Sequence, residues 1–422
     1  MRFIYTGLLY LICPFFILRL FWKSYRNPGY RERWIERLGF ITGAPLKNTL
    51  WIHAVSVGEV QASQQLIKQL KQSFPDKSIV ISTTTPTGAE RAKQLFSEDL
   101  IHFYFPYDLP WVINRWLNHV NPHLLLMMET EIWPNLLRAC EQRNILTLLA
   151  NARMSEKSAR GYQWLGQFSQ NAFKSIDQVA AQSEADAQRF IDLGVSSEKI
   201  EVTGSIKFDA HQPVLVQEQA EVLRRIWGVD RPVWMAASTR DGEEEAILAA
   251  HKRVCAQIPE ALLVLVPRHQ ERFDRVALLC KKRGFSLVRR SSQLSCLATD
   301  NIFLGDSMGE LAVMYQAADL AFVGGSLVNA GGQNILEPAS LGLPVLFGPS
   351  MYNFTAISDL FLQEQAAVQV DDVAALAEQV IYWLADASER TRVGENGRRV
   401  VEENKGAVDR LMKLILKLNS PG

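Results

Sequence analysis

The chain of 422 residues has only five cysteines, and they form no metal-binding or disulfide pattern. They lie far apart in the sequence and include no Cys-x-x-Cys pair: Cys13, Cys140, Cys255, Cys280 and Cys296. An odd, scattered set is typical of reduced thiols in the cytosol. A disulfide framework or a zinc site is therefore not expected.

Motifs that mark several enzyme classes are missing as well. There is no GxxxxGK[ST] loop, which argues against ATP or GTP hydrolysis, and there is no HExxH segment. No Asp-x-Asp pair occurs either, although many nucleotide-dependent transferases use it to hold a metal on a diphosphate. We therefore predict no metal site and no cofactor.

The formal net charge at pH 7 is zero, but the charged residues are unevenly distributed along the chain. Residues 1–40 contain seven Lys/Arg and two Glu, which leaves 38 basic and 43 acidic residues in the rest of the chain. A basic end on a mildly acidic body suits an anionic membrane surface. Nucleic acid would require a basic face on the folded domain, so it is not expected as a partner.

The basic segment includes a long apolar stretch near the N-terminus. Residues 3–22 are interrupted only by Thr6, Gly7, Pro14 and Arg19. A helix of this length rises about 30 Å, which matches the hydrocarbon core of a bilayer. No small-residue cleavage site follows. We predict a membrane anchor at 1–22, spanning or interfacial, with a cytoplasmic body; the alternative is a buried helix of the first domain.

Beyond the anchor, apolar strand-like runs alternate with amphipathic helical patterns in two series. The first series comprises 50–55, 78–83, 123–128, 145–149 and 178–181, and the second comprises 233–237, 261–266, 286–288, 301–303, 320–323 and 344–347. This alternation predicts two parallel, doubly wound α/β sheets facing a cleft. The predicted domains are 23–208 and 233–422, with a linker at 209–232 that contains Pro213.

Three segments of the first half carry candidate catalytic groups. Glu59 follows Gly58 in a strand–turn–helix segment, where it is either a general base or a helix-dipole charge. Glu129 and Glu131 follow an apolar strand, where carboxylates are costly unless they are hydrogen-bonded or used. Lys207 follows a glycine turn and could stabilise a developing anion.

The second half carries candidate ligand-binding segments. Pro267 and Arg268 end a buried strand, and 308–310 begin a predicted helix whose N–H groups could hold a phosphate. Four glycines lie between 324 and 332, and Glu337 follows in a helix start, where a carboxylate could accept ribose hydroxyls.

The motifs of these segments run through the whole chain in a fixed order. They include HAVSVGE (53–59), TTTPTGAERA (83–92), PYDLP (106–110), METEIWPN (128–135), NARMSEKSARGY (151–162), TGSIKFD (203–209), VPRHQERF (266–273), GDSMGEL (305–311) and FVGGSLVNAGGQNILEPA (322–339). In these motifs the chain resembles the 3-deoxy-D-manno-octulosonic acid (Kdo) transferases of lipopolysaccharide biosynthesis.

The resemblance implies a GT-B architecture and inverting, metal-independent transfer of Kdo from CMP-Kdo to the lipid A precursor, lipid IVA, at the cytoplasmic face of the inner membrane. It implies Glu59 as the general base, with Glu129 and Lys207 as transition-state stabilisers. The implied CMP-Kdo-binding residues are Pro267, Arg268, Met308, Gly309, Glu310, Asn334, Ile335, Leu336 and Glu337. Possible supporting residues are Gly58, Glu131, Gly324, Gly325 and Ser326.

Two other functions fit parts of the same pattern. One is a different membrane-associated GT-B glycosyltransferase that uses a UDP-sugar. The other is a catalytically inactive membrane scaffold, although every carboxylate and basic group implied by the resemblance is present. A panel of sugar donors separates all three.

Overall fold

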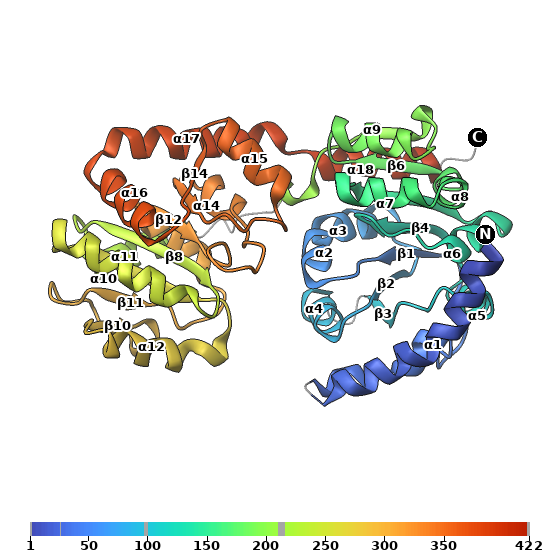
Figure 1. Ribbon diagram of the computed structural model, residues 1–422, viewed down its shortest axis with the longest axis horizontal. Helices are drawn as coiled ribbons and strands as arrows, with labels where there is room; N and C mark the ends of the chain where they lie inside the picture. Colours follow the sequence, from blue (N-terminus) through green and yellow to red (C-terminus); the bar gives the residue numbers. More distant parts are fainter. Residues whose placement is uncertain (1, 26, 97–99, 210–215, 420–422) are drawn as a thin grey trace. The chain divides into compact units, whose positions relative to one another are not determined.

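The structure, a computed structural model, describes residues 2–25, 27–96, 100–209 and 216–419. The chain divides into two compact units (Figure 1). Unit 1 comprises Met1–Ala210 and Lys405–Gly422, and unit 2 comprises His211–Asn404. Each unit contains a seven-stranded sheet in which every pairing is parallel.

The sheet of unit 1 has the strand order β3-β2-β1-β4-β5-β6-β7. Its strands are β1 (Thr49–His53), β2 (Ile79–Thr83), β3 (Ile101–Tyr104), β4 (Pro122–Met128), β5 (Leu146–Ala152), β6 (Gln178–Ala181) and β7 (Ile200–Val202). The interior strands β1, β2 and β4 are almost wholly buried because helices cover both faces, so their sequences are largely apolar instead of alternating.

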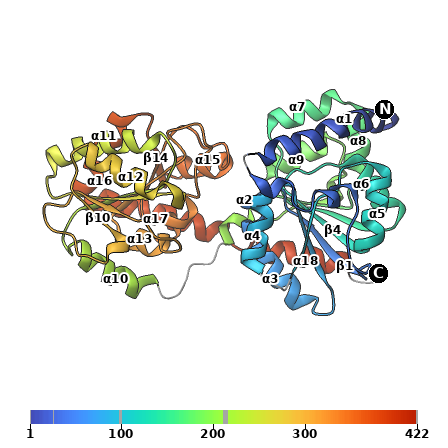
Figure 2. The same cartoon turned by 90° about the horizontal axis from the view of Figure 1, so that it is seen from below.

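Alternate residues of these strands enter two separate cores. Trp51 and Leu125 pack with one set of helices: α5 (Pro110–Val120), α6 (Pro134–Gln142), α7 (Glu156–Trp164), α8 (Gln167–Lys174) and α9 (Glu184–Asp192). Ile52 and Leu126 pack with the other: α2 (Val57–Ala62), α3 (Gln64–Ser73), α4 (Pro86–Phe96) and α18 (Ala407–Asn419). Figure 2 shows helices on both sides of the sheet.

Unit 2 repeats this plan with the strand order β10-β11-β9-β8-β12-β13-β14. Its strands are β8 (Val233–Thr239), β9 (Leu262–Pro267), β10 (Leu287–Arg289), β11 (Ile302–Leu304), β12 (Leu320–Val323), β13 (Val345–Phe347) and β14 (Ala367–Gln369). Its helices are α10 (Val216–Trp227), α11 (Glu243–Gln257), α12 (Phe273–Lys282), α13 (Leu311–Ala317), α14 (Leu336–Ser340), α15 (Thr355–Gln363), α16 (Val373–Ala385) and α17 (Ala387–Asn404). The prediction of two doubly wound α/β sheets is confirmed.

The domain boundaries differ from the predicted ones at the C-terminus. The predicted second domain runs to residue 422, but α18 packs in the second core of unit 1 through Leu411 and Ile415. The Asp209 carboxylate accepts the N–H groups of Gly406 and Val408 at 2.6 Å, which stabilises the start of α18. Part of the predicted linker, 210–215 with Pro213, lies outside the described residues, and α10 belongs to unit 2.

Three strands were not predicted: β3, β7 and β14. All three are sheet edges of three or four residues that are at least partly exposed. An edge strand contacts the apolar core on fewer sides, so its sequence lacks the apolar run that identifies a central strand.

Candidate functional site

Glu59 lies in the first turn of α2, at the carboxyl end of β1. Ser56 is the N-cap of this helix; its hydroxyl accepts the Glu59 N–H at 3.4 Å and donates to Glu59 Oε1 at 2.9 Å. The Val55 N–H donates to Glu59 Oε2 at 2.8 Å. Glu59 therefore satisfies free N–H groups at the helix start, and the same bonds fix its carboxylate at the edge of the sheet.

The environment of Glu59 also changes its acidity. Burial raises the pKa of Glu59 to about 7, and the negative charge of Glu129 adds to the rise; the hydrogen bonds from Val55 and Ser56 only partly oppose it. A base with a pKa near 7 is well matched to accepting a proton from a hydroxyl at neutral pH. The capping and the general-base interpretations are thus compatible in one residue.

Glu129 and Lys207 form an ion pair at the same edge. Glu129 directly follows β4 and has a φ of +57°, in the left-handed region that non-glycine residues rarely adopt. Its Oε1 lies 3.3 Å from Lys207 Nζ. Lys207 belongs to η5 (Ile206–Asp209), a short 3₁₀ helix that follows β7. Glu59, Glu129 and Lys207 are distant in sequence, and they are brought to one edge of the sheet by the carboxyl ends of β1, β4 and β7.

Glu131 has a supporting position beside this pair. The Trp133 indole N–H donates to Glu131 Oε2 at 2.8 Å, and His53 Nε2 lies 3.7 Å from the same oxygen. His53 is fully buried, with Nδ1 3.0 Å from Ser82 Oγ and its ring stacked on Phe105 at 3.7 Å. Its Nε2 has no hydrogen-bond partner among the described residues. His53 thus faces the candidate site from within the sheet.

The loop that carries Lys207 is fixed from two sides. Asn151, at the end of β5, accepts the Ile206 N–H through its side-chain oxygen at 3.1 Å. From α18, the Arg410 guanidinium donates to the Thr203 carbonyl at 2.8 Å. The C-terminal helix and β5 therefore both position Lys207.

In unit 2, Arg268 follows β9, and Glu337 lies in the first turn of α14. Asn334 donates to Glu337 Oε1 at 3.3 Å and accepts the Leu336 N–H at 3.1 Å. Burial raises the pKa of Glu337, whereas the Asn334 hydrogen bond and the positive charge of Arg268 act to lower it. Arg268, Asn334 and Glu337 are therefore brought together, and Pro267 ends the strand that delivers the arginine.

The glycine-rich segment 324–332 is held by a carboxylate, Glu243, that the sequence did not reveal as its partner. The fully buried Glu243 carboxylate accepts the N–H groups of Gly325, Ser326 and Leu327 at 2.6–3.0 Å. A side chain at Gly324 would lie 2.7 Å from the Thr239 Cα, so only glycine fits there. These N–H groups hold the loop against α11 and are not free to bind a ligand.

The 308–310 segment begins α13 differently from the prediction. Glu310 is the N-cap of α13 and forms an ion pair with Arg290 at 2.7 Å, and the hydrogen bonds from Arg290 lower its pKa. Met308 is 60% exposed, and Gly309 has a φ of +85° with open space around its Cα. The segment presents an exposed turn whose acidic residue already has a partner.

Arg240 is a candidate that the sequence analysis missed. It lies just beyond β8 and donates from Nη1 to His269 Nε2 at 2.6 Å. Burial and the nearby charge of Arg268 lower the pKa of Arg240. Its Nε is buried without a hydrogen-bond partner in the described part of the chain. A position directly after a strand singled out Arg268, and the same signal could have singled out Arg240.

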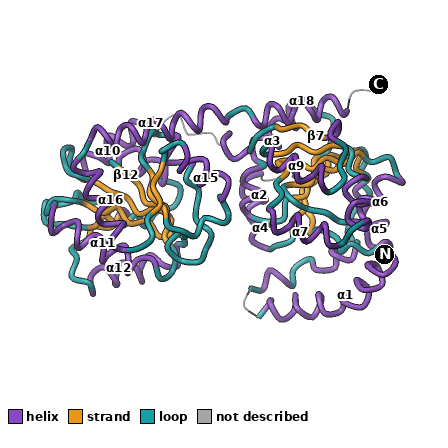
Figure 3. The backbone as a smooth tube through the Cα atoms, turned by 45° about the horizontal axis from the view of Figure 1, so that its top comes forward, coloured by secondary structure: helices purple, strands orange, loops and turns teal. Residues whose placement is uncertain are grey.

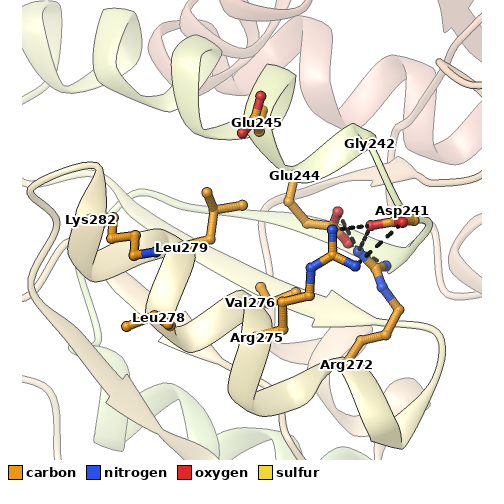
Figure 4. Close-up of a pocket in the computed structure, with 10 residues that line it drawn as sticks. All are labelled: Asp241, Gly242, Glu244, Glu245, Arg272, Arg275, Val276, Leu278, Leu279 and Lys282. Atoms are coloured by element: carbon orange, nitrogen blue, oxygen red, sulfur yellow. Dashed lines mark hydrogen bonds and ion pairs between the residues drawn. The ribbon is translucent and has the colours of Figure 1, made fainter.

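The neighbouring Arg272 has a different role. Its guanidinium pairs with the Glu244 carboxylate at 2.7 Å and lies 3.2 Å from Asp241. Figure 4 shows Arg272 and Arg275 both directed at this acidic group, in a pocket between α11 and α12. Arg272 is therefore neutralised within the protein.

Two solved structures resemble the chain over most of its length. UDP-GlcNAc 2-epimerase from Neisseria meningitidis has a TM-score of 0.60 and 14% identity, covering 88% of this chain and all of that chain. A glycosyltransferase from Rickettsia africae has a TM-score of 0.57 and 16% identity, covering 89% and 100%. Residues 245–400 match the family described as glycosyl transferases group 1. The chain is thus an α/β glycosyltransferase of the GT-B type.

The sequence comparisons define the family within this class. Residues 32–210 match the 3-deoxy-D-manno-octulosonic-acid transferase family. The transferase of that name from Haemophilus influenzae is 42% identical over 98% of both chains, and that from Bordetella pertussis is 34% identical over 97% of this chain and 98% of its own. The chain belongs to the 3-deoxy-D-manno-octulosonic acid transferase family, as the resemblance predicted.

Proposed function

We propose that this enzyme transfers Kdo from CMP-Kdo to a sugar hydroxyl of the lipid A precursor, with inversion and without a metal, at the cytoplasmic face of the inner membrane. The observation that carries the proposal is the Glu59 carboxylate, which is fixed by hydrogen bonds at a sheet edge and has a pKa of about 7. Family membership supports the donor and the acceptor class.

In the proposed reaction, Glu59 accepts the proton of the acceptor hydroxyl while that oxygen attacks the anomeric carbon of Kdo. The bond between the anomeric carbon and the phosphate oxygen breaks, and its electron pair leaves with CMP. Attack from the face opposite CMP inverts the anomeric carbon. Lys207, oriented by Glu129 at 3.3 Å, is a cation at this edge that offsets the developing negative charge.

The donor carries two anionic groups, a phosphodiester and the Kdo carboxylate, and unit 2 offers two arginines for them. We assign Arg268, which the family resemblance places in the CMP site, to the phosphate, and Arg240 to the second anion. The buried Nε of Arg240 has no hydrogen-bond partner among the described residues, and this supports the assignment, because a buried N–H without a partner is costly unless a ligand binds it. Glu337 and Asn334 remain available for the ribose and base.

A direct assay tests donor and acceptor together. The purified full-length protein is incubated with the tetraacylated lipid A precursor and CMP-Kdo generated in situ, and the lipid is followed by mass spectrometry. We expect the mass of the lipid to increase by one or more Kdo units, and the size of the increase gives the number of units added.

Two other results would contradict the proposal. Transfer only from a UDP-sugar would indicate a different GT-B reaction. CMP binding without turnover on any lipid acceptor would indicate an inactive scaffold.

A further inference from the structure

Among the described residues, α1 (Arg2–Ser24) is the one helix long and apolar enough to cross a bilayer. Its 23 residues rise about 34 Å, so length permits crossing but does not require it. The contacts of α1 with the rest of unit 1 distinguish a helix that crosses the bilayer from one that lies along its surface.

The N-terminal end of α1 is attached to the body of unit 1. The Tyr5 hydroxyl donates to the Asp108 carboxylate at 2.9 Å, and the Thr6 hydroxyl donates to Asn135 Oδ1 at 3.2 Å. The Tyr5 ring also packs on Phe168, with ring centroids 5.3 Å apart. Asp108 is itself buried and accepts the first N–H groups of α6.

The middle and the C-terminal end of α1 contact the same unit. Phe16 stacks on Tyr107 with centroids 5.9 Å apart, and Phe21 contacts Trp34 edge-to-face at 5.6 Å. Figures 1 and 3 show α1 running along unit 1. The helix therefore contacts one unit along its whole length.

These contacts give α1 an inner and an outer face. Residues at helical spacing on the inner face are partly covered or buried: Tyr5, Leu9, Cys13, Ile17, Leu20 and Ser24. The outer face is apolar, and six of its side chains are each at least 64% exposed: Phe3, Ile4, Leu11, Phe15, Leu18 and Trp22. An exposed apolar face of this size requires an apolar environment.

A crossing helix is incompatible with the contacts of its first turn. If α1 crossed the bilayer and kept them, the 106–110 loop and the start of α6 would enter the hydrocarbon with the Asp108 carboxylate. Irregular backbone and a carboxylate are both costly there. If α1 crossed without these contacts, Asp108 and Asn135 would lose their partners on α1.

We propose that α1 lies in the plane of the membrane surface, with its outer face in the bilayer and its inner face on unit 1. The exposed Arg19 and Arg31 beside it suit anionic headgroups, as is typical of in-plane anchors. The loops that contact α1 follow β3 and β4, at the same edge as Glu59 and Glu129. The lipid surface and the proposed base therefore share one edge of unit 1. This inference rests on the membrane attachment within the proposed function.

Disulfide cross-linking of the full-length protein in isolated inner membranes tests the arrangement. In a Cys13→Ser background, Tyr5→Cys is combined with Phe168→Cys. The control pair is Leu11→Cys with Phe168→Cys, because Leu11 is 69% exposed on the outer face. Oxidation should give an intramolecular, reductant-sensitive mobility shift for the first pair in the membrane fraction and none for the control.

Labelling provides a second measurement that does not depend on cross-linking. Phe3→Cys should be inaccessible to a membrane-impermeant maleimide in intact spheroplasts and should react after detergent is added. Labelling of Phe3→Cys from outside, without the cross-link, would show a crossing helix and overturn the proposal.

A cross-link between two chains would indicate a second copy on this face, and cross-linked protein found only in the soluble fraction would show that no lipid covers it. Either result overturns the proposal. The Kdo-transfer assay on the same membranes separates these outcomes from a failure of the proposed reaction, because the topology readouts do not depend on turnover.

Discussion

Glu59 provides the most direct test at the scale of single residues. Glu59→Gln keeps the size of the side chain but removes the base, so kcat should fall by about 10²–10⁴-fold with CMP binding retained. Steady-state transfer and CMP titration measure the two effects. Glu156→Gln, at an exposed position, is the control. Wild-type turnover by Glu59→Gln would exclude the general-base role.

The pH dependence follows from the direction of the Glu59 shift. The base must be deprotonated, so kcat/KM should rise with pH towards about 7 and then level off. The charge of Glu129 helps to raise that pKa, so Glu129→Gln should move the acid limb to lower pH as well as reduce kcat. An unmoved acid limb in Glu129→Gln would show that another group controls it.

Arg240 tests the assignment of the second donor anion. Loss of a charge-assisted hydrogen bond costs about 1.5–3 kcal/mol, so Arg240→Ala should raise the KM for CMP-Kdo by roughly 10- to 100-fold. Inhibition by CMP, which lacks the Kdo carboxylate, should change little. Arg275→Ala is the matched control, because Arg275 is exposed and pairs with Asp241. An equal loss of CMP affinity would assign Arg240 to the phosphate instead.

At this scale, position in the sequence singled out some residues of the candidate site and not others. Glu129 was recognisable because a carboxylate directly after an apolar strand is costly without a use. Its pairing with Lys207 was not, because the pairing depends on how β4 and β7 are ordered in the sheet. Glu243 was not among the predicted residues, because carboxylates are common in the first turn of a helix, and only the fold brings it beneath the glycine loop.

At the scale of elements, α18 has a consequence for the site. Asp209→Ala removes two hydrogen bonds at the start of this helix and should lower the free energy of unfolding by about 1 kcal/mol. Because α18 and η5 hold the Lys207 loop, kcat should fall more than the donor KM changes.

Denaturant titration and steady-state kinetics measure the two effects of Asp209→Ala. Asp192→Ala, at an exposed helix end, is the control. Loss of stability with an unchanged kcat would show that α18 does not position Lys207.

The elements themselves were predictable in proportion to their burial. Central strands such as β4 and β9 are continuously apolar because both faces are covered, and they were found close to their observed bounds. The edge strands β3, β7 and β14 lack that signal. The return of α18 to unit 1 depends on a tertiary contact that its own amphipathic pattern does not encode.

At the scale of the whole molecule, the two units divide the proposed work, and α1 belongs to unit 1. Deletion of residues 1–25 should leave the cores intact, because Ser24 is the only buried side chain among the described residues of α1. CMP binding, which we assign to unit 2, should therefore be unchanged. Transfer to acceptor in vesicles should fall by on the order of tenfold or more, because membrane attachment raises the local acceptor concentration.

Detergent-dispersed acceptor provides the internal control for this deletion. Without a bilayer, the full-length and shortened proteins should differ little in kcat, since Glu59, Glu129 and Lys207 remain in place. Equal losses on vesicles and in detergent would show that α1 supports the active-site edge itself through its contacts with Asp108 and Asn135. Equal activity of both proteins on vesicles would show that the outer face of α1 makes no contribution to reaching the lipid.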